Sequence, residues 1–248
     1  ETIAGLKFKI GGETLNIEAT LNFLTDQKRE NRKNATHELA RVFGENIKIF
    51  TRVHNTQAKE KEIIDRWRGM PTPQMGRHLA NQVEPEVVEA LRNAVVNAYP
   101  KISHRYYELK RKWLGLETMQ VWDRNAPLPM ESDRLVTWDQ AQTIVTDAYT
   151  NFDSRMSDLI TPFFNKGWID AGVKPGKAPG AFAHPTVTDV HPYIMLNYLG
   201  KPRDVMTLAH ELGHGVHQVL ASSQGQMLSS TPLTLAETAS VFGEMLTF

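Results

Sequence analysis

The segment HELGHGVH, residues 210–217, holds three histidines and one glutamate within eight residues. Imidazole nitrogen is a common zinc ligand, and a carboxylate can either bind the ion or move a proton. His210 and His214 are one helical turn apart, so their rings can bind the same ion. This HExxH spacing predicts a zinc site in which His210 and His214 are ligands and Glu211 is the general base acting on water.

A helix over 203–221 would position these side chains. Its apolar residues recur with helical spacing and form one face, whereas the three histidines fall on the opposite side and Glu211 lies on the flank. Histidines on a solvated helix face would produce the same pattern, so this helix alone leaves both interpretations open. The apolar face consists of Val205, Leu208, Leu212, Val216 and Val219.

A catalytic zinc needs a third protein ligand and one open position. His217 lies about 10 Å of helix rise beyond His210, too far to bind the same ion within one continuous helix. We therefore expect the third ligand on a second helix, predicted over 233–248. Its expected core face is Leu235, Phe242 and Leu246, and its opposite face carries Glu237, Ser240 and Glu244.

Both glutamates of this second helix are candidate ligands. The one that does not bind the ion can instead accept the imidazole N–H of a ligand histidine, which fixes the orientation and tautomer of the ring. Glu244 is assigned to this second role and is the alternative ligand to Glu237. Asp189 and Asp204 are weaker candidates for supporting a ligand in the same way.

The segment HPYIMLNYL, residues 191–199, predicts a strand because aromatic and branched residues follow a proline. As an edge strand it could pair with an extended peptide; the alternative is a strand paired on both sides within a small sheet. Polar side chains near it, and on the first helix, are candidates for contacting substrate or supporting a ligand. They are His184, His191, Tyr193, Tyr198 and His217.

The other elements are mostly helical. Residues 6–19 predict a hairpin around two glycines, and helices are expected over 26–66, 85–98 and 100–114. A capping box at 137–140 opens the next helix, and another runs to about residue 166. The sequence predicts a mainly α fold with a small β element beside the site. We expect a helical region with a hairpin over 1–125 and a partial catalytic domain over 126–248.

Composition excludes several classes of protein. Acidic and basic residues balance at 28 each, so no net field favours nucleic acid or an anionic membrane. No apolar run approaches the roughly 20 residues that a membrane helix needs. The chain has no cysteine, which excludes disulfides and thiolate metal sites and fits a reducing compartment. Since the first residues also lack the apolar core of a signal peptide, we expect a cytoplasmic protein.

The run PGAF, then HPYIMLNYLGKPRDVMTLAHELGHGVHQ, then LAETASVFGE resembles oligoendopeptidase F and its thimet-oligopeptidase-like relatives. RWRG, SHRYYELKRKWLGL and WDRNAPLP upstream are similar to the oligoendopeptidase F branch. In that family a glutamate in an E-x-x-S motif is the third zinc ligand, and 237–240 match it. The resemblance thus implies that His210, His214 and Glu237 bind one zinc and that Glu211 is the base. It also implies a helical zinc-peptidase fold whose deep channel, walled in part by the N-terminal region, admits short peptides.

The same resemblance implies a tyrosine and a histidine beyond Phe248 that steady the tetrahedral intermediate. We therefore expect a fragment truncated at both ends, which the missing C-terminal portion of the same protein would complete. The sequence does not begin with Met, and its last helical pattern reaches Phe248 without a stop signal. The leading prediction is a zinc endopeptidase acting on short peptides. Alternatives are a non-catalytic zinc- or peptide-binding module and a zinc carboxypeptidase with the same HExxH motif.

Overall fold

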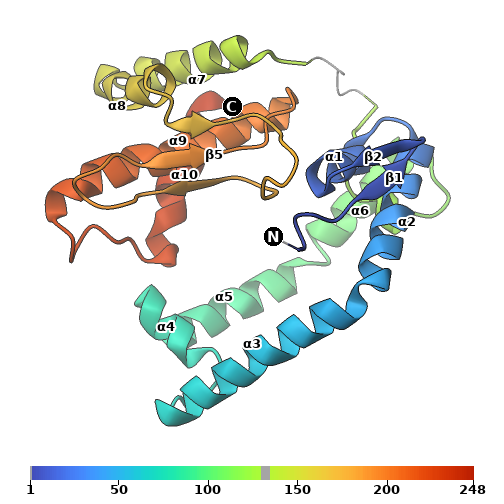
Figure 1. Cartoon of the computed structure of the whole chain (residues 1–248), viewed down its shortest axis with the longest axis horizontal. Helices are drawn as coiled ribbons and strands as arrows, with labels where there is room; N and C mark the ends of the chain where they lie inside the picture. Colours follow the sequence, from blue (N-terminus) through green and yellow to red (C-terminus); the bar gives the residue numbers. More distant parts are fainter. Residues whose placement is uncertain (1, 130–134) are drawn as a thin grey trace. The chain divides into compact units, whose positions relative to one another are not determined.

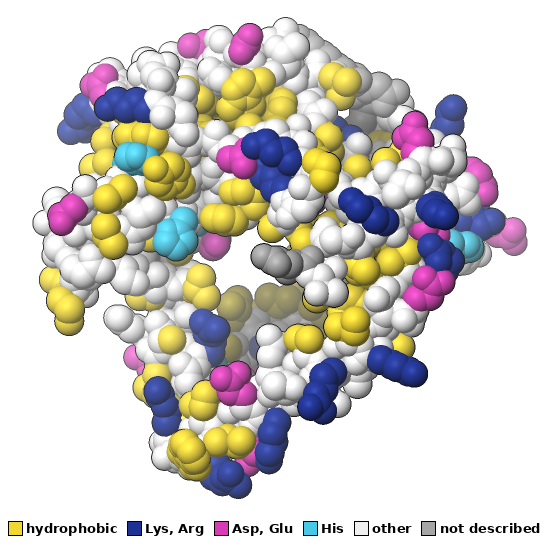
Figure 2. Space-filling view, viewed as in Figure 1, with side chains coloured by type: hydrophobic (Ala, Val, Ile, Leu, Met, Phe, Trp, Pro, Cys, Tyr) yellow, Lys and Arg dark blue, Asp and Glu magenta, His cyan; other side chains and the backbone are white. Residues whose placement is uncertain are grey.

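The computed structural model describes residues 2–129 and 135–248 (Figure 1). Contacts divide the chain into two compact units, Glu1–Glu131 and Ser132–Phe248. Basic and acidic side chains are interspersed over the visible face (Figure 2). Within the described ranges, every helix is too short or too polar to span a membrane.

The N-terminal unit begins with the predicted hairpin and continues as helices. Strand β1 (Phe8–Ile10) pairs antiparallel with β2 (Glu13–Leu15). The two glycines between them have positive φ angles, which residues with a Cβ rarely adopt. The following elements are α1 (Ile17–Asn22), η1 (Phe23–Thr25), α2 (Arg29–Glu45), α3 (Ile47–Trp67), α4 (Met75–Asn81), α5 (Pro85–Ala98), α6 (Ser103–Trp113) and η2 (Val121–Asp123).

The single helix predicted over 26–66 is wrong, because the chain breaks at Asn46 into α2 and α3. Asn46 leaves helical geometry, with φ −101° and ψ 10°. Its side-chain nitrogen donates to the Val42 carbonyl at 2.8 Å and so satisfies an acceptor in the last turn of α2. Asparagine readily makes such local bonds, which explains why hydrophobic periodicity alone did not reveal the break.

A buried ion network joins the start of α2 to η2 in the N-terminal unit. Arg29 Nη2 lies 2.8 Å from Asp123 Oδ2, and Arg32 Nη2 lies 3.2 Å from Oδ1. The backbone N–H of Gln120 donates to the same carboxylate at 2.9 Å. The hydrogen bond from Arg29 is the main cause that lowers the pKa of Asp123 to about 2. The ionised carboxylate therefore stabilises the packing of these segments.

We expect Asp123→Asn to lower the free energy of unfolding of this unit by about 3 kcal/mol at pH 7, because two guanidinium groups lose their buried partner. The folded pKa of Asp123 is depressed, so its contribution is present above the unfolded pKa and is lost as pH falls through about 2. Urea unfolding followed from pH 7 down to pH 2 should show the gap between variant and wild type closing. Asp153→Asn, which removes an exposed ion pair with Arg155, is the control and should change stability little.

The C-terminal unit combines four helices with a small sheet. Its elements are α7 (Trp138–Phe152), α8 (Ser154–Asn165), β3 (Ile169–Asp170), β4 (Phe182–His184), β5 (Tyr193–Met195), α9 (Pro202–Ala221), η3 (Ser222–Gln224) and α10 (Leu233–Thr247). The predicted capping box is confirmed, because Thr137 and Gln140 exchange hydrogen bonds at the start of α7. Helix α9 contacts strands β4 and β5 as well as helices α7, α8 and α10.

The strand predicted over 191–199 is confirmed only at Tyr193–Met195. Of its two interpretations, the edge strand is wrong and the strand paired on both sides is confirmed. The sheet order is β3-β5-β4, with β5 parallel to β3 and antiparallel to β4. Both sides of β5 are thus paired, and a peptide cannot add to it. The strand at the edge nearest α9 is β4, which was not among the predicted strands.

The core of the C-terminal unit contains the predicted apolar face of α9. Val205, Leu208, Leu212 and Val216 are buried, and Val219 packs against them. The face predicted to bury α10 is wrong in part, because Leu235 and Phe242 are exposed and only Leu246 joins the core. Small residues face α9 instead, with Ser240 and Gly243 fully inside. Small side chains let the two helix backbones approach closely, and a scale of hydrophobicity does not register them.

Candidate metal centre

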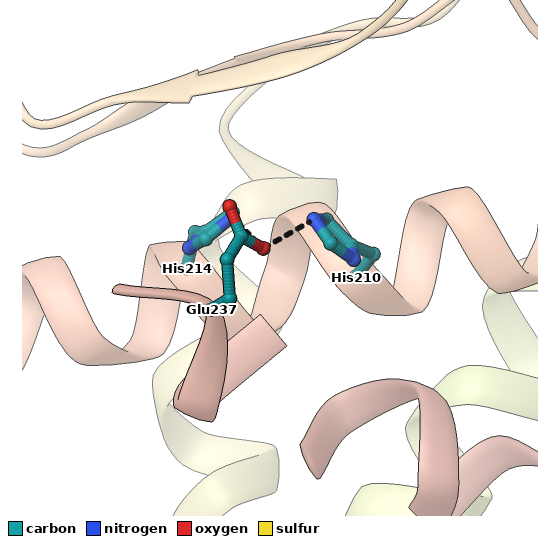
Figure 3. Close-up of side chains that lie close together, drawn as sticks. All are labelled: His210, His214 and Glu237. Atoms are coloured by element: carbon teal, nitrogen blue, oxygen red, sulfur yellow. Dashed lines mark ion pairs between the residues drawn. The ribbon is translucent and has the colours of Figure 1, made fainter. Parts of the chain in front are cut away.

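Three donor groups converge between α9 and α10 (Figure 3). His210, His214 and Glu237 each offer one ligand atom, and these atoms lie within 4.8 Å of one another. Glu237 Oε2 is 3.3 Å from Nε2 of His210 and 3.6 Å from Nε2 of His214. Ligands at zinc distances of about 2.0–2.1 Å in a tetrahedron are separated by roughly 3.4 Å, so this donor set fits one zinc ion.

Ser240 fixes the carboxylate of Glu237. Its buried hydroxyl donates to Glu237 Oε2 at 2.7 Å and also lies 3.1 Å from the backbone carbonyl of Glu237. This bond holds the carboxylate against α9 although the side chain of Glu237 is 58% exposed. Helical periodicity places Ser240 on this face, but the sequence alone assigns it no role. The three-residue spacing, which aligns two side chains on a helix, was the available signal.

The second glutamate of α10, Glu244, contacts the nitrogen of His210 that does not face Glu237. Glu244 Oε1 lies 2.5 Å from Nδ1 of His210. A carboxylate at Nδ1 favours a proton on that nitrogen and leaves Nε2, which faces Glu237, as the free lone pair. The structure therefore separates the two glutamates that the sequence left as alternatives: Glu237 faces both imidazoles, and Glu244 faces one ring from behind.

Glu211 neighbours the three donors in sequence but is not one of them. Its side chain is buried, at 5% exposure, and Oε2 has no hydrogen-bond partner within the described part of the chain. Burial raises the pKa of Glu211 to about 7, although nearby His210 and the backbone N–H of Ala183 in β4 oppose this shift. Burial also lowers the pKa of His214, which favours the neutral imidazole that a metal requires.

The remaining candidates lie around the groove or outside it. His217 lines a groove of about 640 Å³ together with His214, His191 and Asp189. The ring of His191 stacks on Trp168 with centroids 3.8 Å apart, and Tyr193 packs against it while remaining exposed. None of these side chains is placed among the three converging donors.

Three candidates are engaged in local structure. The hydroxyl of Tyr198 donates to the Val136 carbonyl at 2.8 Å, which ties the end of the sheet to α7. Asp204 accepts backbone N–H groups at the start of α9, including that of Lys201, and so caps this helix. His184 Nδ1 accepts the backbone N–H of Thr186 in the turn after β4.

A helix carrying an HExxH pair, closed by a glutamate from a second helix, is the arrangement of a helical metallopeptidase. Residues 22–248 match peptidase family M3, and the chain belongs to this family. Family membership supports a peptidase that uses a metal ion. Together with the mainly helical fold, it bears out the resemblance noted in the sequence.

Curated relatives are similar over most of this chain. It is 24% identical to oligopeptidase PepF of Bacillus subtilis over 227 residues, which are 91% of this chain and 34% of that protein. It is 26% identical to group B oligopeptidase PepB of Streptococcus agalactiae over 90% of this chain and 37% of that protein. The chain thus spans about a third of the length of these relatives.

Solved structures share the fold. PZ peptidase A, solved with an inhibitor, superposes with a TM-score of 0.87 at 19% identity, over 99% of this chain and 44% of that one. Oligoendopeptidase-F from Enterococcus faecium superposes with a TM-score of 0.57 at 19% identity, over 98% of this chain and 37% of that one.

Proposed function

We propose that this chain carries the zinc-binding and general-base part of an endopeptidase that hydrolyses short peptides. The observation that carries the proposal is the convergence of His210, His214 and Glu237 within 4.8 Å, beside the buried carboxylate of Glu211. The names of the relatives, oligopeptidase and oligoendopeptidase, support peptides as the substrate class. Because the chain spans only about a third of the relatives' length, the activity of the whole protein is also part of this proposal.

In the proposed reaction, each residue has one task. A bound zinc ion would polarise the scissile carbonyl and lower the pKa of a water molecule toward neutrality. Glu211 takes the proton from that water and returns it to the nitrogen of the leaving amine. Glu244 and Ser240 keep His210 and Glu237 in the orientations that binding requires.

The groove beside His214 would receive the peptide. Strand β4 forms an edge of the sheet next to α9, so an extended backbone can align beside it by strand pairing. His217 and His191 line the same groove and would contact the peptide, while the hydroxyl of the exposed Tyr193 is a further donor nearby. Hydrogen bonds to the peptide backbone depend little on the identity of the peptide side chains. Binding of this kind therefore suits an enzyme that cleaves varied short peptides.

Two other functions fit the geometry less well. A non-catalytic zinc module has no use for Glu211, whose burial is costly because Oε2 has no hydrogen-bond partner among the described residues. A carboxypeptidase needs a cation that binds the C-terminal carboxylate of its substrate. Among described residues the groove is lined by Asp158 and Asp189 and by no lysine or arginine, which favours an endopeptidase.

Zinc titration with elemental analysis tests the ligand assignment. Wild-type protein should hold one zinc per chain. Glu244→Gln should weaken zinc binding by about 10–100-fold, because the variant keeps all three ligands but loses the carboxylate behind His210. Glu237→Gln should lose more, because it removes a ligand. Exposed Glu86→Gln is the matched control. Zinc kept by Glu237→Gln but lost by Glu244→Gln would make Glu244 the ligand.

Cleavage of an internally quenched peptide tests the peptidase assignment. The zinc-loaded chain is assayed alone and as part of a protein extended to the length of its relatives. We expect cleavage in the extended protein, and its loss in Glu237→Gln. A zinc-loaded extended protein that leaves all peptides intact would contradict the proposed function.

A further inference from the structure

The side chain of Gln218 reaches from α9 to the edge strand β4. Its Nε2 donates to the backbone carbonyl of Ala183 at 3.3 Å. Gln218 is seven residues after Glu211, so the two side chains lie on the same face of α9, two turns apart. Glu211 accepts the backbone N–H of the same Ala183. One helix face thus contacts both polar backbone groups of a single strand residue.

Ala183 is the residue of β4 whose backbone N–H and C=O point away from β5, toward the outer side of the sheet. It lies opposite Ile194 of β5, and the Ile194 N–H donates to Trp168 on the other side of the sheet. In an antiparallel pair, alternate residues turn their N–H and C=O away from the partner strand. An extended peptide that adds to this edge would donate a backbone N–H to the outward carbonyl of Ala183, while the Ala183 N–H stays with Glu211.

The contact made by Gln218 is weak by its own geometry. A donor–acceptor distance of 3.3 Å is long for an N–H···O bond. The other end of the same amide, Oε1, is buried and has no hydrogen-bond partner within the ranges that the structure describes. Leaving an acceptor buried and unpaired offsets much of what one long bond contributes. Gln218 can therefore be displaced at little cost, and it borders the groove into which it would move.

We propose that Gln218 is a placeholder for substrate. In the absence of peptide, its amide N–H occupies the Ala183 carbonyl; an extended peptide replaces it there with a backbone N–H, and the Gln218 side chain swings into the groove. The inference rests on the proposed function, because it assumes that peptides bind along β4. Gln218 then lowers the affinity for the peptide backbone by competing with it. Removing the amide should strengthen peptide binding, whereas removing a residue that contacts the peptide would weaken it.

Gln218→Met keeps the length of the side chain and removes its donor. We expect the variant to bind peptide about three- to tenfold more tightly, because the peptide no longer competes with the amide for the Ala183 carbonyl. The probe is a fluorescein-labelled hexapeptide, followed by fluorescence anisotropy in EDTA, where metal-dependent cleavage does not consume it. Gln142→Met, on α7 and outside the groove, is the matched control and should bind as wild type does. Thermal melting verifies that each variant is folded, and Gln218→Ala is a second variant with the same expected sign.

A scan of peptides with one N-methylated backbone amide provides the second arm. Methylation at a single position of the peptide should weaken binding to both wild type and Gln218→Met. At that position the peptide loses the N–H that it would donate to the Ala183 carbonyl. Wild-type protein that binds peptide while both Gln218 variants bind it equally or more weakly would overturn the placeholder alone. Protein that binds zinc but no peptide, with or without metal, would overturn the peptidase proposal and the placeholder with it.

Discussion

Glu211→Gln is expected to reduce peptide cleavage by the extended, zinc-loaded protein by about 10²–10⁴-fold and to leave zinc binding unchanged. Glutamine has nearly the same shape as glutamate but cannot take a proton from water. The carboxylate lies beside the three donors without being one of them, so its loss removes chemistry and no ligand. Cleavage of a quenched peptide and zinc titration, measured on the same preparation, separate the two effects.

The same substitution has a second effect that needs no activity. The folded pKa of Glu211, about 7, is raised above the ordinary 4.5, so the folded metal-free protein binds a proton more tightly than the unfolded chain does. The associated stability is fully present below pH 4.5 and is lost as pH rises through 7, a difference of about 3 kcal/mol. Glu211→Gln carries no titratable group at this position and should remove that part of the pH dependence.

Unfolding of the metal-free protein at pH 5 and pH 8 measures this difference. Glu86→Gln, on an exposed turn of α5, is the control and should keep the wild-type profile. Cleavage that survives in Glu211→Gln would assign the base to another residue. A pH profile that is identical in wild type and Glu211→Gln would mean that the carboxylate is not held in an apolar environment.

The part of the candidate site on α9 could be predicted from the sequence. The same helical period that places apolar residues on one face places His210 and His214 together on the other. His210 and His214 are neighbours on any helix, whatever surrounds it. The position of Glu237 depends on how a second helix folds back against α9. Periodicity could not decide whether Glu237 or Glu244 faces the histidines, because both lie on the same face of α10. Only tertiary packing shows that Glu237 faces two imidazole rings while Glu244 faces one ring from behind.

Each error in predicting the fold has an identifiable physical cause. Hydrophobic periodicity identifies helices that bury large side chains, whereas α10 packs on α9 through small residues and exposes Leu235 and Phe242. Strand β4 has three residues, too few for alternation to be recognised. Strand β4 reaches the site through the backbone N–H and C=O of Ala183. Every residue type except proline has both groups, so the identity of the residue does not reveal this contact.

Gly213→Ala is expected to destabilise the C-terminal unit by about 3 kcal/mol and to abolish tight zinc binding. Gly213 lies in the HExxH segment, where the backbone of α10 crosses α9. A methyl group there would lie 2.8 Å from the Cα of Ser240 and would also overlap the backbone carbonyl of Ala239. Backbone atoms cannot move aside as a flexible side chain does, so α10 must shift outward and carry Glu237 away from both histidines.

Gly44→Ala is the matched control for this effect. Gly44 also lies in a helix, but an added Cβ would have no neighbour within 4 Å. Alanine is the better helix former by up to about 1 kcal/mol, so this variant should be equally or more stable than wild type. Gly243→Ala repeats the test from α10, where an added Cβ would lie 2.6 Å from the Ala209 carbonyl and overlap the hydroxyl of Tyr149.

Urea unfolding and zinc titration of the three glycine variants distinguish packing from helix propensity. If close approach of α9 and α10 builds the site, both Gly213→Ala and Gly243→Ala lose stability and zinc affinity together, whereas Gly44→Ala loses neither. Zinc affinity retained in a destabilised Gly213→Ala would mean that Glu237 follows the histidines when the helices separate. The third ligand would then depend on the length and freedom of its own side chain rather than on the spacing of two helix backbones.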